Sequence, residues 1–180
     1  SYIFYHQEFD LSLFKRTPAE DNMIVSSFLN APQAYETYLT WQELPGLMPG
    51  WKFQEFGAGS RDGDLMPERL YSEMVRSRFV WQVKPGGDGF GHVIHNLMAV
   101  GRAPIIRLSD YKWTLAGELM IPNETCVDIE GQSLDQIAMT LVHKYDLAEV
   151  MGNRLADMFY SKVNFDAIAK RVEMFLENLA

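Results

Sequence analysis

The chain has 180 residues, 47% hydrophobic and 22% charged, which is typical of one globular domain large enough to bury a core. Its formal net charge of −8 argues against a nucleic-acid partner, because phosphate neutralisation needs clustered lysine and arginine. The single cysteine, Cys126, leaves no internal disulfide, and the apolar runs fall short of the ~18 residues of a membrane helix. We therefore expect a cytoplasmic protein without a transmembrane segment.

Strand-like and helix-like segments alternate along most of the chain, after a connector over residues 1–22. Short apolar runs predict strands over residues 23–29, 51–56, 79–83, 103–107 and 125–129. Helical spacing predicts helices over residues 33–44, 67–76, 92–100, 111–119 and 133–145, with Pro45 and Gly46 ending the first. This alternation predicts an α/β domain over residues 23–145, a Rossmann-like parallel sheet with helices on both faces.

The C-terminal residues 146–180 differ in kind from this alternating region. They predict two successive helices, over residues 146–160 and 165–179, and the second helix carries an apolar stripe. We expect these helices to pack on the α/β domain or on an N-terminal domain that the chain lacks.

A glycine-dense loop follows the predicted third strand. Four glycines fall within residues 86–91, with Asp88 among them, and a predicted helix begins at His92. Glycine lets backbone N–H groups approach phosphate oxygens, and a helix N-terminus adds partial positive charge. Ligands of parallel sheets bind at the carboxyl ends of the strands, where this loop falls. The loop therefore predicts a site for a nucleotide diphosphate.

Other polar side chains follow strands at the same edge of the predicted sheet. A second glycine-rich turn, Gly57–Gly63, follows the second strand and carries Arg61, and Lys84 follows the third strand. We expect these two cations to face the diphosphate. Asn30 and Asp110 follow the first and fourth strands and are further candidates for reaching a ligand.

The stretch that begins at this loop resembles the donor-binding C-terminal domain of GT-B fold glycosyltransferases of the retaining type. In that family an acid precedes Gly-Phe-Gly, and a second acid stands eight positions after the first, opening a stretch that includes Met-Ala-x-Gly. Here Asp88 precedes Gly-Phe-Gly at residues 89–91, and Met-Ala-Val-Gly follows at residues 98–101. Asn96 stands where the second acid would be.

Two departures from the family pattern affect the expected chemistry. Asn96 can hydrogen-bond a diol, but it lacks the charge-assisted strength of a carboxylate. The segment Arg102–Pro104 is also one residue longer than the usual spacing.

The resemblance implies transfer of a sugar from a nucleotide-diphosphate sugar to an acceptor hydroxyl, without a metal or a further cofactor. Asp88 would face the sugar and Asn96 the ribose hydroxyls. Together with the two cations above, the expected donor-binding residues are Gly87, Asp88, Gly89, Phe90, Gly91, His92, Asn96, Arg61 and Lys84. An N-terminal domain would bind the acceptor and supply part of the catalytic machinery, so no catalytic residue is assigned.

A dinucleotide-binding oxidoreductase is one alternative. Gly57–Gly63 spells a Gly-x-Gly-x-x-x-Gly variant of the nucleotide fingerprint after a strand. That fingerprint requires an acid at the end of the next strand to hold the ribose 2′-hydroxyl. Val83–Pro85 stands there, which disfavours NAD, although Lys84 would suit the 2′-phosphate of NADP.

A metal site is a second alternative, because Asp88, His92 and His95 are spaced four and three residues apart. An isolated histidine pair is more often a surface or hydrogen-bonded core feature, so we expect no metal.

A module that binds a nucleotide sugar or a partner without turnover is the third alternative. The single domain and the Asn96 departure favour such a module over a complete enzyme.

Overall fold

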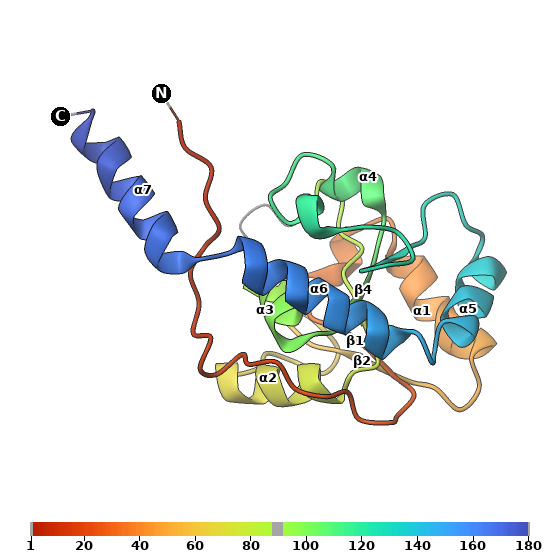
Figure 1. Cartoon of the computed structure of the whole chain (residues 1–180). Coiled ribbons are helices and arrows are strands. Elements are labelled where there is room, and N and C mark those ends of the chain that lie inside the picture. The colour runs from red at the N-terminus through yellow and green to blue at the C-terminus, as the bar shows by residue number, and fades with distance from the viewer. Residues whose placement is uncertain (1, 88–91, 180) are drawn as a thin grey trace.

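The chain folds around one parallel β-sheet. The computed structural model describes residues 2–87 and 92–179. The strands are β1 (Ile24–Ser27), β2 (Lys52–Glu55), β3 (Phe79–Trp81), β4 (Ala103–Ile106) and β5 (Val127–Asp128). Their order is β2-β1-β3-β4-β5, and all neighbours are parallel (Figure 1). The Rossmann-like α/β fold predicted from the sequence is confirmed.

Helices cover both faces of this sheet. The helices of the described residues are α1 (Tyr38–Leu47), α2 (Pro67–Arg76), α3 (His92–Val100), α4 (Leu108–Tyr111), α5 (Leu134–His143), α6 (Ala148–Lys162) and α7 (Phe165–Glu177), of which α7 does not cover the sheet. Two short 3-10 turns, η1 (Pro32–Ala34) and η2 (Gly117–Leu119), complete the regular structure. Apolar residues of α2, α3 and the later part of α6 form a core on one face, and those of α1, α5 and the first part of α6 form a second core on the other.

The strands are buried on both faces, as the continuous apolar runs in the sequence predict. Val25, Phe79 and Ile105 have no exposed surface, and they belong to the core that α1 and α5 cover. Val80 points to the opposite core, against Leu97 of α3. Burial of both strand faces fixes the register of the sheet, because a slip of one residue would exchange the two faces.

The strand order reverses between β1 and β3. From β1 the chain passes outward to β2 and then returns to the other side of β1 to form β3. In open parallel sheets this reversal leaves a crevice at the carboxyl ends of the two strands. The loops that follow β1 and β3 therefore flank the point at which the fold best accommodates a ligand.

Two predicted helices differ from the structure. Helix α1 begins later than predicted and continues through Pro45 and Gly46, because Leu44 and Met48 on either side of them are buried in the core. The predicted helix over residues 111–119 is replaced by α4 and η2. Gly117 lies so close to Tyr111 that a Cβ atom there would be 2.0 Å from the Tyr111 carbonyl oxygen, so the chain turns where a helix was expected.

The amino edge of the sheet is organised by the buried side chain of Arg102. Its guanidinium donates to the carbonyls of Val75, at the end of α2, and of Val100 and Gly101, at the end of α3. It also donates to the carbonyls of Thr17 and Pro18 in the N-terminal segment. Burial lowers the pKa of Arg102 to about 10, which leaves the side chain charged at neutral pH. Thus one cation satisfies helix-end carbonyls that would otherwise lack a partner.

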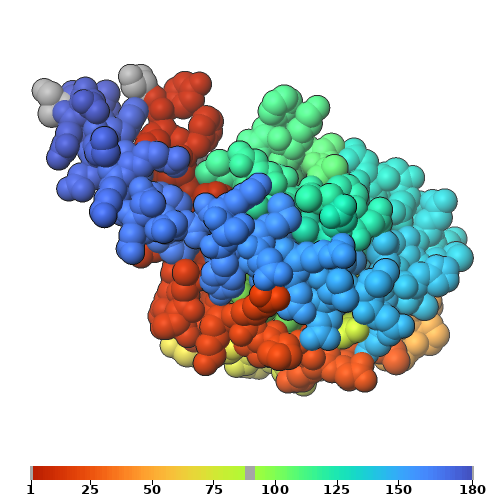
Figure 2. Space-filling model, viewed as in Figure 1, coloured from red at the N-terminus to blue at the C-terminus, as the bar shows by residue number. Residues whose placement is uncertain are grey.

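The two C-terminal helices relate differently to the core. Helix α6 packs on α3 and β4, whereas α7, as described, has no buried residue and projects away from the sheet (Figure 1). The N-terminal segment runs beside α7, and the two project together from the body of the molecule (Figure 2). Arg171 donates a hydrogen bond to the Phe4 carbonyl, and the rings of Phe9 and Phe165 lie 5.4 Å apart.

No helix over residues 2–87 and 92–179 combines the length and the apolar character needed to cross a lipid bilayer.

Substitution of Gly152 tests the close packing of α6. A Cβ atom at Gly152 would lie 2.2 Å from the Gly101 carbonyl oxygen, so we expect Gly152→Ala to destabilise the fold by about 1–3 kcal/mol through overpacking. Gly46 in α1 has open space around it, so Gly46→Ala should be neutral or stabilise the fold by up to about 1 kcal/mol. Urea unfolding measures both changes. A Gly152→Ala variant as stable as the unsubstituted protein would contradict the packing.

Candidate nucleotide-diphosphate site

The glycine loop after β3 is held against the segment that follows β4. Gly86 and Gly87 have positive φ angles of 76° and 67°, which glycine adopts without strain. A Cβ atom at Gly87 would lie 2.4 Å from the Asp110 carbonyl oxygen, so only glycine fits there. Close packing on Asp110 therefore explains the glycine at position 87, which the sequence pattern attributes to phosphate binding.

Two backbone amides of this loop already have partners. The Gly86 amide donates to Asp110 Oδ1 at 3.1 Å, and the Gly87 amide donates to the Lys84 carbonyl at 2.9 Å. A phosphate at this position would have to use other donors. The predicted site residues Asp88, Gly89, Phe90 and Gly91 lie outside the described residues.

Helix α3 carries the remaining loop-side candidates. His92 is its first residue and is exposed, and Asn96 lies about one turn later. Only 2% of Asn96 is exposed, and its Oδ1 atom has no hydrogen-bond partner among residues 2–87 and 92–179. A buried polar atom without a partner costs about 1–3 kcal/mol, so this oxygen is suited to accept a hydrogen bond from a ligand hydroxyl.

The two predicted cations lie on different strands. Lys84 follows β3, beside the strand-order reversal, and is partly buried. Arg61 lies beyond β2, at the outer edge of the sheet. Its Nη2 donates to the Phe53 carbonyl at 2.8 Å, and its guanidinium also pairs with Asp62. The structure therefore brings Lys84 to the glycine loop and places Arg61 along the free side of the edge strand.

The structure also locates the polar candidates of the first and fourth strands. Asn30 accepts a hydrogen bond from the Ala58 amide, so it links the loops after β1 and β2. Asp110 accepts from the Gly86 amide and pairs with Arg107, at 2.8 Å from Nε. Arg107 in turn pairs with Glu36 from the loop after β1. Sequence reasoning missed Arg107 and Glu36, because only the position of Arg107 directly after a strand marks it out.

A histidine pair lies next to the site. His6 of the N-terminal segment and His95 of α3 are 2.9 Å apart, between Nδ1 and Nε2, and His95 is buried. Within the described ranges, no three histidine, cysteine, aspartate or glutamate side chains gather as metal ligands. Asp88, the carboxylate of the alternative metal site, lies outside those ranges.

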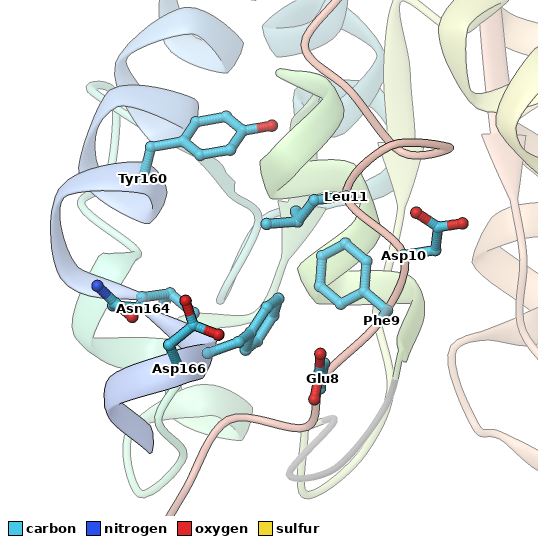
Figure 3. A pocket seen from close by; sticks show the side chains of 9 residues that line it. Glu8, Phe9, Asp10, Leu11, Tyr160, Asn164 and Asp166 are labelled. Carbon is cyan, nitrogen blue, oxygen red and sulfur yellow. The ribbon is translucent and has the colours of Figure 1, made fainter. Parts of the chain in front are cut away.

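Two cavities lie on another side of the molecule, between the N-terminal segment and the C-terminal helices. The first, of about 850 Å³, is lined by residues 8–11 and by the junction of α6 and α7; Figure 3 shows its labelled side chains, including Phe9, Asp10 and Tyr160. The second, of about 960 Å³, lies between residues 5–8 and α7. Their lining residues include none of the loops at the carboxyl ends of the strands, so neither cavity is part of the diphosphate site.

Solved structures of other proteins share this fold. The TM-score is 0.73 to sucrose-phosphate synthase from Thermosynechococcus elongatus, at 14% identity over 95% of this chain and 51% of that chain. HepE from Anabaena in complex with UDP-glucose gives 0.70 at 16% identity, over 94% of this chain and 56% of that chain. TarM from S. aureus in a complex that includes UDP gives 0.70 at 15% identity, over 87% of this chain and 36% of that chain.

The chain thus spans about half the length of the first two proteins and about a third of the other. No known family profile matches the sequence, and no curated protein sequence matches it significantly. At these identities the likeness establishes the Rossmann-like fold and agrees with the resemblance to GT-B proteins. The donor-binding residues, including Asn96 in place of the second acid, stay predictions.

Arg61→Ala separates a structural role of Arg61 from phosphate binding. The contacts of Arg61 with Phe53 and Asp62 favour the structural role. We expect the substitution to lower Tm by about 2–4 °C, as a loss of about 1 kcal/mol does in a domain of this size, without changing UDP affinity. Arg69→Ala is the matched control, because Arg69 is an exposed arginine that lines a cavity beside β2 together with Arg61. A several-fold loss of UDP affinity in Arg61→Ala alone would support the phosphate role predicted from the sequence.

Docking of the N-terminal segment should weaken in acid. Burial, with the nearby His95 and Arg171, lowers the pKa of His6 to about 4. Because the undocked histidine keeps its ordinary pKa near 6.5, protonation favours undocking, and the docked state loses stability as pH falls from about 6.5 to 4. NMR contacts between Phe9 and Phe165 should therefore fade over that range. His6→Gln should remove the effect and His143→Gln should keep it; a contact insensitive to pH would contradict the assignment.

Proposed function

We propose that this chain is the donor-binding domain of a glycosyltransferase that transfers a sugar from a nucleotide-diphosphate sugar to an acceptor hydroxyl. The observation that carries the proposal is the buried Oδ1 atom of Asn96, which has no partner in the described part of the chain. It lies in the first part of α3, on the helix that follows the glycine loop, where the strand order reverses. The shared fold with proteins solved with UDP-glucose and UDP supports the same class of ligand.

The proposed site surrounds the diphosphate with the loop and the start of α3. Gly87, Gly89 and Gly91 allow close approach of the donor, and Asp88 faces the sugar. Asn96 accepts a hydrogen bond from a ribose hydroxyl. Phe90, His92 and Lys84 complete the proposed donor-binding residues, with Arg61 as the cation whose role the substitution above decides.

The chemistry that this arrangement supports is departure of a nucleoside diphosphate. Breaking the glycosidic bond leaves negative charge on the diphosphate and positive charge on the sugar ring. The N-terminus of α3 and Lys84 stabilise the first charge, and the carboxylate of Asp88 stabilises the second. The acceptor and its general base come from a second domain, in keeping with the span of this chain over about half of sucrose-phosphate synthase and HepE.

A nucleotide-sugar-binding module without turnover is the second candidate. Asn96 in place of an acid favours it, because a neutral amide holds a diol less strongly than a carboxylate does. Incubation with donor and a supplied partner domain separates the two candidates, since only the enzyme releases free nucleoside diphosphate with transfer of the sugar.

Calorimetric titration tests the shared part of both candidates. We expect a diphosphate of uridine, guanosine or thymidine to bind, and the matching nucleotide sugar to bind more tightly. Asp88→Ala should remove that extra affinity of the sugar. Asn96→Ala should weaken binding of the nucleoside diphosphate by up to about tenfold, the value of one hydrogen bond. For uridine or guanosine diphosphate, it should also abolish the preference over the 2′-deoxy analogue.

The same titrations contain the result that rejects this function. Tight binding of NADP, with no nucleoside diphosphate bound, would favour the oxidoreductase alternative. An Asn96→Ala variant that keeps its preference for the ribose diol would remove the assignment of Asn96 alone.

A further inference from the structure

A guanidinium lies across the carboxyl edge at the strand-order reversal. Arg107 is the residue after β4, and its side chain reaches the loops that follow two other strands. Through Asp110 it is connected to Gly86, in the loop after β3, and through its Nη1 it contacts Glu36, in the loop after β1. Within residues 2–87 and 92–179, one cation, Arg107, thus links the loops after β1, β3 and β4.

Asp110 holds the guanidinium of Arg107 close to the glycine loop. Nε of Arg107 lies 2.8 Å from Asp110 Oδ2, and the other oxygen of that carboxylate accepts from the Gly86 amide at 3.1 Å. Next to Glu36, Thr37 Oγ1 donates to the carbonyl of Val83, at 3.2 Å. The loop after β1 is therefore hydrogen-bonded to the segment that follows β3, and Arg107 contacts Glu36 in the first loop and Asp110 beside the glycine loop.

The two carboxylates that contact Arg107 differ in how firmly they are held. The Asp110 side chain is 13% exposed and is fixed by two contacts. The Glu36 side chain is 72% exposed, and its one polar contact with the described residues is the ion pair with Arg107, at 2.6 Å. An exposed ion pair contributes only about 0–1 kcal/mol, since water and salt compete for both charges. Asp110 is thus a fixed support, and Glu36 is an exchangeable partner.

We propose that Arg107 is the cation that binds the diphosphate of the donor, and that Glu36 occupies it until the diphosphate takes its place. The inference builds on the proposed function, because it assigns a residue to the nucleotide-diphosphate site. Asp110 keeps its hold on Nε, which leaves the Nη atoms of Arg107 directed at the incoming ligand. No covalent bond changes; one anionic partner replaces another.

A diphosphate suits this position better than a carboxylate does. The guanidinium presents parallel N–H donors that match two phosphate oxygens, and a diphosphate carries more charge than Glu36. Arg107 follows β4, and its side chain reaches Glu36 in the loop after β1, next to the reversal between β1 and β3. Arg61 lies beyond β2 and is paired with Asp62 and the Phe53 carbonyl. Of these two arginines, Arg107 is the one that the fold places at the crevice.

Substitutions at the two ends of the ion pair should change affinity in opposite directions. In titrations with UDP and with inorganic pyrophosphate, we expect Arg107→Ala to lower affinity about tenfold or more, the loss of a charge-assisted bidentate contact. Arg107→Lys should lower it less. Glu36→Gln should raise affinity about two- to fivefold, because the competing exposed ion pair is removed.

Glu130→Gln is the matched control for net charge. Glu130 also lies at the carboxyl edge, where it accepts from the Ser109 amide, and it makes no ion pair with Arg107. The Glu130→Gln substitution should leave the affinity for UDP and pyrophosphate within about twofold of that of the unsubstituted protein, because a nearby exposed charge contributes little. Thermal unfolding of every variant shows that the changes occur in folded protein.

The outcomes separate this inference from the proposed function. If the unsubstituted protein binds UDP and Arg107→Ala and Arg107→Lys bind it equally well, the role of Arg107 is rejected while the donor site stands. If Glu36→Gln gains no affinity, or Glu130→Gln gains as much, the exchange with Glu36 is rejected. If the unsubstituted protein binds neither nucleoside diphosphates nor pyrophosphate, the proposed function fails and Arg107 has no such role.

Discussion

The buried guanidinium of Arg102 is the contact on which the arrangement of the chain depends. It donates hydrogen bonds to five carbonyls of α2, the end of α3 and the N-terminal segment, at the amino edge of the sheet. Removing it would leave these acceptors buried without donors, which costs more than an ordinary hydrogen bond contributes. Arg102 therefore holds the C-terminal ends of α2 and α3 in place at the amino edge.

Binding is proposed at the carboxyl edge, opposite the edge that Arg102 holds. The loops after β1, β3 and β4 are joined to one another at this edge by hydrogen bonds and an ion pair between side chains and backbone groups. Asp110 is central there, because its two oxygens hold a backbone amide of the glycine loop and the guanidinium of Arg107. A ligand that changes the surroundings of Arg107 thus acts directly on the support of the loop.

The sequence predicted the sheet and most of the helices, because apolar runs and helical spacing are local signals that burial reinforces. It could not predict that α1 continues through Pro45, since that outcome depends on the burial of Leu44 and Met48. In the sequence, the extra residue in the segment Arg102–Pro104 is only a departure from a family pattern. In the structure, Arg102 is buried and donates hydrogen bonds to the carbonyls of several segments. Glycine content at Gly87 read as phosphate binding, although contact with Asp110 explains part of it. Long-range partners such as Glu36 and Arg107 leave no trace in spacing.

The closed side of β2 has a consequence for how molecules of this protein meet one another. The turn after β2 folds back along the strand. The Glu55 amide donates to Asp62 Oδ2, the Asp62 amide donates to the Glu55 carbonyl, and Arg61 Nη2 donates to the Phe53 carbonyl. A strand at the rim of a sheet otherwise offers its backbone to a neighbouring molecule. With these groups taken, β2 is a poor template for self-association through its edge.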